Sequence, residues 1–417
     1  MKKLDKKNKQ FTIQKSPELG DFRYVQKKGI ELRRQVNELH FKFGISKSEI
    51  ARQKHVSRMF VIRWTEKPDM DVTEDKRGWP KKTSRKWGKE TYRKVKKLHK
   101  KLSSDPKRYF FGATAIELAW KKKYPQDSCP PLRTLGRMLK DQNLITKRKG
   151  CRSKGAARYL CYPEYSIYHH ICNGRLLEAD FMGEKYIHGR SAPVNFLGYS
   201  FKIKPKLRHF KRIESQTSKE FIRYTKRFIK DFEKPPGVKV DNALAFRGSA
   251  SGKRNISATM KYLLSEEIIP IFAVPRKPFS QASIEGNNSV FSRKFWNRTE
   301  FTSLEQVDEE LEWFNDASLE YSQYWEDKKT GPKDKPSLRG FKPCIYFIRQ
   351  VQDSAVSEDG QIDVLNESIQ MPEEYINYFV LAHWDLSAEQ LTVSIEKEQK
   401  LHNIKRVKFR INSDYKI

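Results

Sequence analysis

The sequence predicts a chain of several domains, with two all-α modules, then an α/β domain, then a small all-β barrel. Apolar residues recur at helical spacing up to about residue 143, strand-like runs alternate with amphipathic helices from about residue 174, and short alternating runs return after residue 336. The expected segments are a basic tail at 1–25, a helical domain at 26–66, a basic linker at 67–90, a second helical domain at 91–150, a linker at 151–173, the α/β domain at 174–335 and the barrel at 336–417.

The first helical domain has the pattern of three helices. Ser46, with Glu49 three residues later, predicts the start of the second helix, and Ser57 predicts the start of the third. Two short helices joined by a turn form a helix-turn-helix, which leaves Arg58 and Arg63 among the side chains able to face a DNA groove. A three-helix module with a purely structural role is the alternative.

The second helical domain is expected to contain helices over about 91–102, 113–123 and 132–143. Basic residues on its outer faces include Lys94 and Lys97 in the first helix and Arg133 and Arg137 in the last. Lysines along a helix are often only a solvated face. Because both the first and the last helix carry cations, we favour a second DNA-binding domain that contacts phosphates.

The α/β domain follows from the order of its segments. Strand-like runs at 176–187, 194–203 and 208–214 precede an amphipathic helix that begins after Thr217. A strand at 238–240, helical residues, a strand at 268–274 and two closing helices follow, the last of them capped by Ser303.

Three acidic residues stand where this domain would bring them together. Asp180 lies in an apolar strand-like run, Asp241 ends a strand, and Glu285 lies near the start of a helix. Carboxylates gathered from strand ends and a helix are the ligands that Mg²⁺ or Mn²⁺ prefers, and two such ions can catalyse phosphoryl transfer. The alternative is Glu178, two residues before Asp180 on the same strand face, which could be the true ligand.

The residues around these acids resemble the DDE recombinases of the retroviral-integrase superfamily, including bacterial insertion-sequence transposases with an RNase H-like catalytic domain. The resemblance lies in Asn242 after the second aspartate, Pro275 and Pro278 before the glutamate, and Asn288 three residues after it. The pair Phe314-Asn315 and the run at 336–343 look like the close of the family's catalytic region.

The chain departs from the family pattern at two places. Asp241 and Glu285 lie 44 positions apart, several more than is typical, and Ala243 stands where the family has glycine. The Gly/Ser-rich loop at 247–254 can hold the extra length.

The resemblance implies a catalytic triad of Asp180, Asp241 and Glu285 that binds two Mg²⁺ or Mn²⁺ ions. It also implies a homo-oligomer that acts on double-stranded DNA, namely transposon ends and target DNA. The resemblance leaves open whether an accessory target-selection protein is a further partner. Asn288, Arg293 and Lys294 follow Glu285 within two helical turns and are candidates for contacting DNA there.

Short strand-like runs at 345–348, 361–364, 375–382, 391–395 and 407–411 predict the C-terminal five-stranded barrel, which is SH3-like if it matches the barrels that follow the catalytic domain in integrases. Residues 341–417 hold 9 Lys and Arg against 12 Asp and Glu, a net charge of −3. We therefore expect this barrel to brace an assembly and not to provide the main grip on DNA.

The formal net charge of +33 on 417 residues predicts attraction to a polyanion. Residues 1–150 hold 42 Lys and Arg against 16 Asp and Glu, a net charge of +26, so DNA binding should be concentrated there. The sequence has no apolar stretch of about 18 residues and no signal-peptide pattern, which predicts a cytoplasmic, nucleoid-associated protein without a membrane partner.

The sequence therefore predicts a DNA transposase that hydrolyses the phosphodiester at an element's end and transfers the freed 3′-hydroxyl into target DNA. The alternatives are a DNA-binding regulator derived from a transposase and an RNase H-like nuclease without strand transfer. The acidic trio argues against the regulator, and the two helical DNA-binding domains argue against a simple nuclease.

Overall fold

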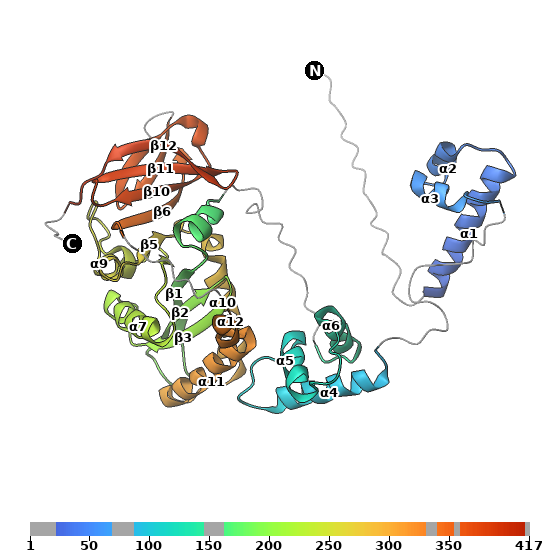
Figure 1. Ribbon diagram of the computed structural model, residues 1–417, viewed down its shortest axis with the longest axis horizontal. Helices are drawn as coiled ribbons and strands as arrows, with labels where there is room; N and C mark the ends of the chain where they lie inside the picture. Colours follow the sequence, from blue (N-terminus) through green and yellow to red (C-terminus); the bar gives the residue numbers. More distant parts are fainter. Residues whose placement is uncertain (1–21, 69–86, 146–161, 331–339, 354–358, 413–417) are drawn as a thin grey trace, which may run out of the picture. The chain divides into compact units, whose positions relative to one another are not determined.

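A computed structural model describes residues 22–68, 87–145, 162–330, 340–353 and 359–412 (Figure 1). The chain divides into two compact units, Met1–Gly88 and Lys89–Ile417, which are described separately. Most of the expected basic tail and of the first linker, residues 1–21 and 69–86, lies outside the described residues.

The first unit contains α1 (Phe22–Phe41), α2 (Lys47–Gln53) and α3 (Arg58–Trp64). The Ser46 side chain accepts a hydrogen bond from the Glu49 backbone at 3.2 Å, and Ser57 accepts one from Phe60 at 3.2 Å, so both serines cap the helices that they were expected to start. Val36, Ile50 and Val61 form its buried core, one from each helix.

Five strands form the middle of the second unit: β1 (Leu176–Lys185), β2 (Val194–Phe201), β3 (Leu207–Ile213), β4 (Gly237–Val240) and β5 (Ile269–Phe272). They lie in the order β3-β2-β1-β4-β5. β1, β2 and β3 are antiparallel neighbours, whereas β4 and β5 run parallel to β1. The order and directions of these strands are compatible with an RNase H-like integrase fold.

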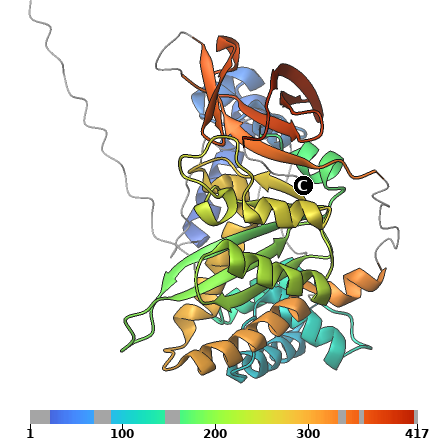
Figure 2. The same cartoon turned by 90° about the vertical axis from the view of Figure 1, so that its left-hand side faces the viewer.

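Helices cover both faces of this sheet. Leu177 and Ala179 of β1 share a core with α7 (Ser218–Asp231), α8 (Leu244–Arg247) and α9 (Ala258–Ser265), and Figure 2 shows α7 and α9 in front of the strands. Met182 of the same strand belongs to a core with α10 (Ala282–Lys294) and α11 (Leu304–Ser322). Because side chains alternate along a strand, Glu178 and Asp180 lie on the α10 side.

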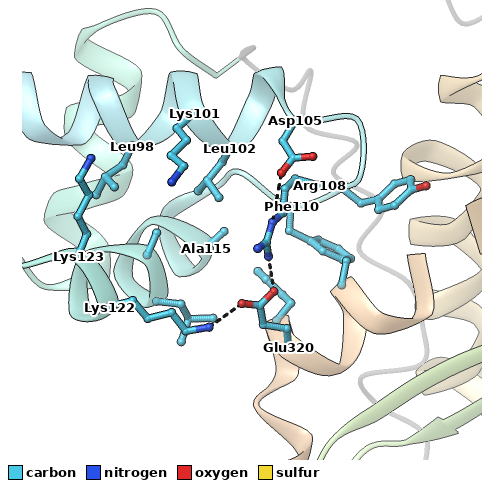
Figure 3. Close-up of a pocket in the computed structure, with 15 residues that line it drawn as sticks. Leu98, Lys101, Leu102, Asp105, Arg108, Phe110, Ala115, Lys122, Lys123 and Glu320 are labelled. Atoms are coloured by element: carbon cyan, nitrogen blue, oxygen red, sulfur yellow. Dashed lines mark hydrogen bonds and ion pairs between the residues drawn. The ribbon is translucent and has the colours of Figure 1, made fainter. Parts of the chain in front are cut away.

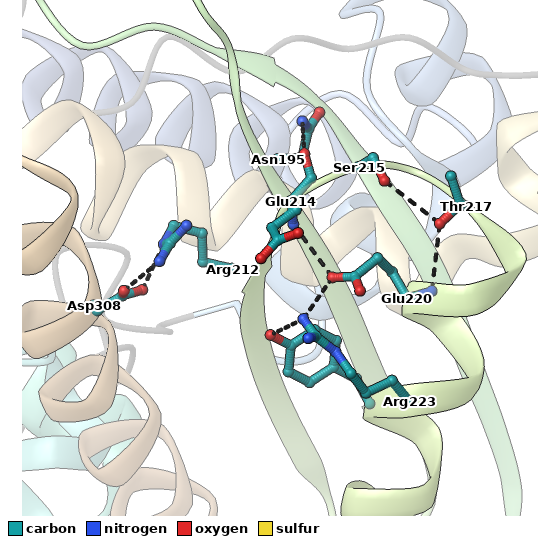
Figure 4. Close-up of polar contacts among 9 residues, drawn as sticks. Asn195, Arg212, Glu214, Ser215, Thr217, Glu220, Arg223 and Asp308 are labelled. Atoms are coloured by element: carbon teal, nitrogen blue, oxygen red, sulfur yellow. Dashed lines mark hydrogen bonds and ion pairs between the residues drawn. The ribbon is translucent and has the colours of Figure 1, made fainter.

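Polar contacts fix how β3 leads into α7 and packs on α11 (Figure 4). Thr217 caps α7 by accepting from the Glu220 backbone at 3.4 Å, as its sequence predicts. The Glu214 backbone N–H donates to Glu220 Oε2 at 3.3 Å, and this hydrogen bond links the first turn of α7 to the end of β3. On the other face, Arg212 donates two hydrogen bonds to Asp308 of α11, at 2.7 and 2.6 Å.

The second helical domain is not free-standing, in contrast to its expected boundary at residue 150. Its helices are α4 (Lys89–Ser104), α5 (Ala113–Lys123) and α6 (Leu132–Asp141), and they belong to the same compact unit as the sheet. Tyr109, between α4 and α5, is 1% exposed and packs edge-on against Phe314 of α11, with ring centroids 5.1 Å apart. Arg108 and Lys122 both pair with Glu320 of α11 (Figure 3). Tyr109 and Phe110, which lie between α4 and α5, therefore attach this helical domain to α11.

The expected linker at 151–173 is also wrong over its described part. Residues 162–172 include the short helix η2 (Ser166–Ile171), and they bury Ile167, Tyr168 and Cys172 against β1, β5 and the C-terminal strands. These aromatic and apolar residues have core contacts that a linker does not make.

The C-terminal strands extend the same sheet and do not form a separate domain. They are β6 (Cys344–Gln350), β7 (Gln352–Asp353), β8 (Gly360–Val364), β9 (Glu367–Met371), β10 (Phe379–Asp385), β11 (Gln390–Lys397) and β12 (Lys400–Lys408). β6 pairs in parallel with β5, which makes a nine-stranded sheet in the order β12-β11-β10-β6-β5-β4-β1-β2-β3, while β7, β8 and β9 form a three-stranded sheet. Among the described strands no closed ring of pairs is present, so the expected independent barrel is replaced by a β structure fused to the α/β domain.

The remaining elements are short. They are α12 (Tyr324–Thr330) and the 3₁₀ helices η3 (Pro278–Gln281), η4 (Trp296–Arg298) and η5 (Glu373–Tyr375). Among the described helices, none combines the length and the apolar character needed to cross a membrane.

Candidate active site

The parallel pairing of β1 with β4 brings Asp180 and Asp241 together. Glu178 lies opposite Lys239 in this pairing, so two residues further along each strand Asp180 comes level with Asp241. Val240 belongs to the core on the α7 side, so by alternation Lys239 and Asp241 lie on the α10 side with Asp180.

Glu285 approaches the same place from α10. It lies in the first turn of this helix, is exposed to solvent, and acts electrostatically on Asp180. Asn288, one turn later, donates a hydrogen bond from Nδ2 to Asp180 Oδ2 at 2.9 Å. The structure therefore brings together all three acids and the asparagine that the sequence singled out.

Burial raises the pKa of both aspartates, and the charges of neighbouring carboxylates add to this effect at Asp180. Burial, followed by the charges of Asp241 and Glu285, raises the pKa of Asp180 to about 7 despite the opposing hydrogen bond from Asn288. Burial also raises the pKa of Asp241, against a 2.9 Å hydrogen bond that Oδ1 accepts from the Ala243 backbone. Ala243 has φ of −60°, so this position does not need glycine and the departure from the family pattern causes no strain.

Both carboxylate oxygens of Glu178, the alternative to Asp180, are engaged in the core. Its Oε1 lies 2.7 Å from Lys239 Nζ and accepts from the Tyr168 hydroxyl at 2.8 Å. Its Oε2 accepts from the Ile284 backbone at 2.9 Å, at the start of the helix that carries Glu285. With three donors on its two oxygens, Glu178 holds β4, η2 and α10 in place around the acidic trio.

The sequence reasoning missed Lys239, Tyr168 and Arg349 as supports of this site. Arg349 of β6 donates to Asn242 Oδ1 at 3.0 Å, next to Asp241 in the chain. The available signal was a charged residue inside an otherwise apolar strand, as in GVKV for Lys239 and CIYFIRQ for Arg349. Such a residue must find a partner when it is buried, but its partner cannot be read from local spacing.

The chemistry of these side chains fits a divalent cation, although their oxygens do not close around one. Three hard carboxylates are present, and the charges of Asp241 and Glu285 act unfavourably on Asp180. Asn288 Oδ1, beside Asp180, is buried and has no hydrogen-bond partner among the residues that the structure describes. Within the described ranges, however, no group of three His, Cys, Asp or Glu side chains is arranged as a metal site. The carboxylates would have to converge further to bind an ion.

The residues expected to contact DNA differ in their exposure to solvent and in their pairing with other side chains. Arg58, Arg63, Lys97, Arg133, Arg137 and Arg293 are exposed. Lys94, by contrast, lies 2.7 Å from Asp127 and 3.1 Å from Glu90, and these two hydrogen bonds are the main causes that raise its pKa. Lys294 Nζ lies 4.2 Å from the centroid of the Phe111 ring. Lys94 is thus the weakest candidate among the predicted phosphate contacts.

One cavity in the described residues lies away from the acidic trio. It has a volume of about 520 Å³ and is bounded by α4, α5 and α11, with Leu98, Phe110 and Tyr321 among its lining residues and the Arg108–Glu320 and Lys122–Glu320 pairs beside it (Figure 3). None of Asp180, Asp241 and Glu285 lines it. This cavity and the acidic trio are therefore separate features of the structure.

Solved structures of integrases and a transposase are similar to this chain at low sequence identity. The catalytic core domain of BIV integrase is 13% identical, with 37% of this chain and 97% of that chain covered and a TM-score of 0.27. A chain of the simian T-cell lymphotropic virus intasome in complex with the PP2A regulatory subunit B56 gamma is 12% identical, covering 67% and 97%, with a TM-score of 0.34. The Mos1 transposase paired-end complex with the left transposon end is 12% identical, covering 71% and 93%, with a TM-score of 0.28.

No family model matches the chain, and a search of curated proteins finds no match. Because all three TM-scores lie below 0.5, the fold rests on the strand order described above.

Proposed function

We propose that the protein is a metal-dependent DNA transposase that cuts at transposon ends and joins the 3′-hydroxyl ends to target DNA. The observation that carries the proposal is the position of Asp180, on β1, beside Asp241, just past the end of the parallel neighbour β4. Burial, followed by the charges of Asp241 and Glu285, raises the pKa of Asp180 to about 7. A fold that gathers uncompensated carboxylates in this way needs a counter-charge.

In this proposal Asp180 and Asp241 would hold two Mg²⁺ or Mn²⁺ ions, and Glu285 would complete the second site. Ions bound there would lower the pKa of an attacking water and offset negative charge at the scissile phosphate. Asn288 orients Asp180, and the Ala243 backbone N–H orients Asp241. Glu285, in the first turn of α10, is the most exposed of the three carboxylates.

The helical domains supply the DNA contacts in the same proposal. Arg58 and Arg63 of α3 read base edges as part of a helix-turn-helix. Lys97, Arg133 and Arg137 neutralise phosphates, whereas Lys94 contributes little because carboxylates already hold it. Arg293 and Lys294 follow Glu285 on α10 and face the DNA near the acids. The protein acts as a homo-oligomer, since two ends must be joined together, with an accessory protein for target selection.

The test is a cleavage and strand-transfer assay with Mg²⁺ on duplexes that carry the sequences flanking the gene. Asp241→Asn should abolish both cleavage and joining and leave end binding within about twofold of the unmodified protein, because an amide binds a hard cation poorly. The matched control is Asp231→Asn, an exposed aspartate at the end of α7, which should keep full activity.

The outcomes separate the three possible functions. Cleavage without joining would indicate a nuclease, and specific binding without either reaction would indicate a regulator. Full strand transfer by the Asp241→Asn protein would show that the acids are assigned wrongly.

A further inference from the structure

Arg349 is a buried arginine without an ion-pair partner among the described residues. It lies on β6, is 4% exposed, and takes part in none of the ion pairs found over the described ranges. Burial lowers the pKa of its guanidinium to about 10, which still leaves it charged at neutral pH. The hydrogen bonds of its guanidinium go to neutral oxygens, and the charge of Asp363 acts on it only electrostatically. Burying a charge in this way is costly, so we ask what its hydrogen bonds hold in place.

The guanidinium ties together the ends of three neighbouring strands. Nη2 donates to Asn242 Oδ1 at 3.0 Å, just past β4, and Nη1 donates to the carbonyl of Ala273 at 3.2 Å, just past β5. Asn242 closes this arrangement by donating from Nδ2 to the same Ala273 carbonyl at 2.7 Å. Nε donates to the carbonyl of Asp363 at 2.6 Å, on β8. The side chain that follows Asp241 is therefore held by both of its polar atoms.

A second attachment holds the loop at 247–254, which follows α8. Asn366, in the turn between β8 and β9, donates to the Gly252 carbonyl at 3.0 Å and accepts from Arg247 Nη1 at 3.3 Å. The Arg254 backbone donates to the Leu365 carbonyl at 3.1 Å. The chain that follows Asp241 is thus held by the C-terminal strands at Asn242 and again at the loop that carries the extra length.

We propose that Arg349 is a positioning residue for Asp241, acting through Asn242, and that β6, β8 and β9 are therefore part of the catalytic centre. The inference rests on the proposed function, because the orientation of the Asp241 carboxylate matters only if Asp241 binds a metal ion. It gives the C-terminal strands a role different from the assembly role expected from their charge.

The experiment compares Arg349→Gln, Asn242→Ala and the double variant in the full chain. Each protein is measured for its rate of end cleavage, for binding of an end duplex, and for the rise in melting temperature caused by Mn²⁺ alone. We expect each single variant to lose about 10–100-fold in cleavage rate and to need more Mn²⁺ for the same rise in melting temperature, while end binding changes by less than about twofold.

The double variant decides whether Arg349 acts through Asn242. If it does, the double variant cleaves about as slowly as the slower single variant, because the same orientation has been lost once. If the two effects multiply, Arg349 acts by another route and the proposal is wrong.

The matched control is Arg175→Gln at the start of the sheet. Arg175 is also largely buried, its pKa is lowered by burial to about 10, and it pairs with Glu233 and with the carbonyls of Ile203 and Pro205. We expect Arg175→Gln to lower the melting temperature and to leave the cleavage rate of the folded protein and the Mn²⁺ response unchanged. If Arg175→Gln loses cleavage as Arg349→Gln does, the loss reflects general destabilisation and the proposal fails.

Two further arms keep the outcome clear. Should Arg349→Gln not fold, Arg349→Lys and Asn242→Ala carry the test, and Arg349→Lys should recover part of the rate because it keeps a charge and a donor. If the unmodified protein shows neither cleavage nor a Mn²⁺ response, the proposed function is wrong. If it shows both and Arg349→Gln retains both, only the positioning role is wrong.

Discussion

Lys239 Nζ lies 2.7 Å from Glu178 Oε1, and the two side chains are only 3% and 2% exposed. Each stands two residues before an aspartate of the proposed site on neighbouring strands, so this ion pair fixes the register that sets Asp180 beside Asp241. The same glutamate accepts a hydrogen bond from the Ile284 backbone and thereby also fixes the start of α10.

Glu178→Gln should therefore destabilise the protein strongly and disturb metal binding only indirectly. Removing one partner of a buried ion pair leaves the other charge uncompensated, which costs about 3–5 kcal/mol. Urea unfolding in EDTA measures the loss, and Glu309→Gln on the exposed side of α11 should change stability by less than about 0.5 kcal/mol. A Glu178→Gln protein with unchanged stability and no Mn²⁺ response would make Glu178 a metal ligand after all.

The acidic trio could be proposed from the sequence because each acid lies next to a local signal. A strand end, an Asp-Asn pair and a helix start can be found from neighbouring residues alone, as can the serine and threonine caps of α2, α3, α7 and α11. The hydrogen bond from Asn288 to Asp180 follows from the same short motif.

Contacts between distant parts of the chain could not be predicted in this way. The β5–β6 pairing joins residues more than 70 positions apart and has no local signature, so the C-terminal strands were expected to form their own domain. The turn at Leu365-Asn366 has positive φ at both positions, 50° and 62°, but lacks the Asn-Gly or Asp-Gly signal of a tight hairpin, and β9 was missed. Tyr109 and Phe110 lie between the expected helices, and their contacts with Glu310 and Tyr321 could not be predicted because these partners lie about 200 residues away.

Without metal, Asp180 should make stability depend on pH between about 4 and 7. Its pKa of about 7 in the folded protein exceeds the ordinary value of 3.8, so the contribution to stability is fully present below pH 4 and is lost as the pH rises through 7. The loss corresponds to a few kcal/mol, at about 1.4 kcal/mol for each tenfold change in proton affinity.

Asp180→Asn should remove this dependence. In EDTA the variant should be more stable than the unmodified protein at pH 8 and about equal to it at pH 4, with Asp231→Asn as the control that changes neither value. Thermal unfolding across this range provides the measurement. Equal stability of Asp180→Asn and the unmodified protein at pH 8 would mean that neither burial nor the neighbouring carboxylates raise the pKa of Asp180 in solution.

Phosphate contacts and base contacts should separate in DNA-binding measurements. Lys97→Ala should weaken binding to every duplex and reduce the slope of log K against log salt by about 1, because one exposed cation no longer displaces a counterion. Lys94→Ala is the matched variant on the same helix, and it should change the slope less, since Asp127 and Glu90 already neutralise this ammonium.

Arg58→Ala and Arg63→Ala should instead reduce the preference for the cognate end, by about 1–3 kcal/mol for a side chain that pairs with a guanine edge. Binding curves on cognate and random duplexes measure this preference. Equal shifts on both duplexes would place these arginines on the phosphate backbone.

The lysine prediction has its own contradicting outcome. Equal salt slopes for the Lys94 and Lys97 variants would show that the ion pairs of Lys94 open on DNA.

A chain that ends at Lys342 should fail to fold, because it would lose four of the nine strands of one continuous sheet. It would remove the fully buried Ile345, Phe347 and Trp384 and leave β5 as an open sheet edge. Each of these side chains contributes about 1.5–3 kcal/mol when buried, and with their neighbours the loss exceeds the total stability of about 5–15 kcal/mol that a domain usually has. An exposed edge of this kind also promotes aggregation.

The control is a chain ending at Asn412, which keeps every described strand and should unfold cooperatively at an unchanged temperature. Circular dichroism, thermal unfolding and size-exclusion chromatography compare the two. If the chain ending at Lys342 is folded, binds a single DNA end and fails only to pair two ends, the C-terminal strands serve assembly, as their charge suggested, and are not part of the catalytic centre.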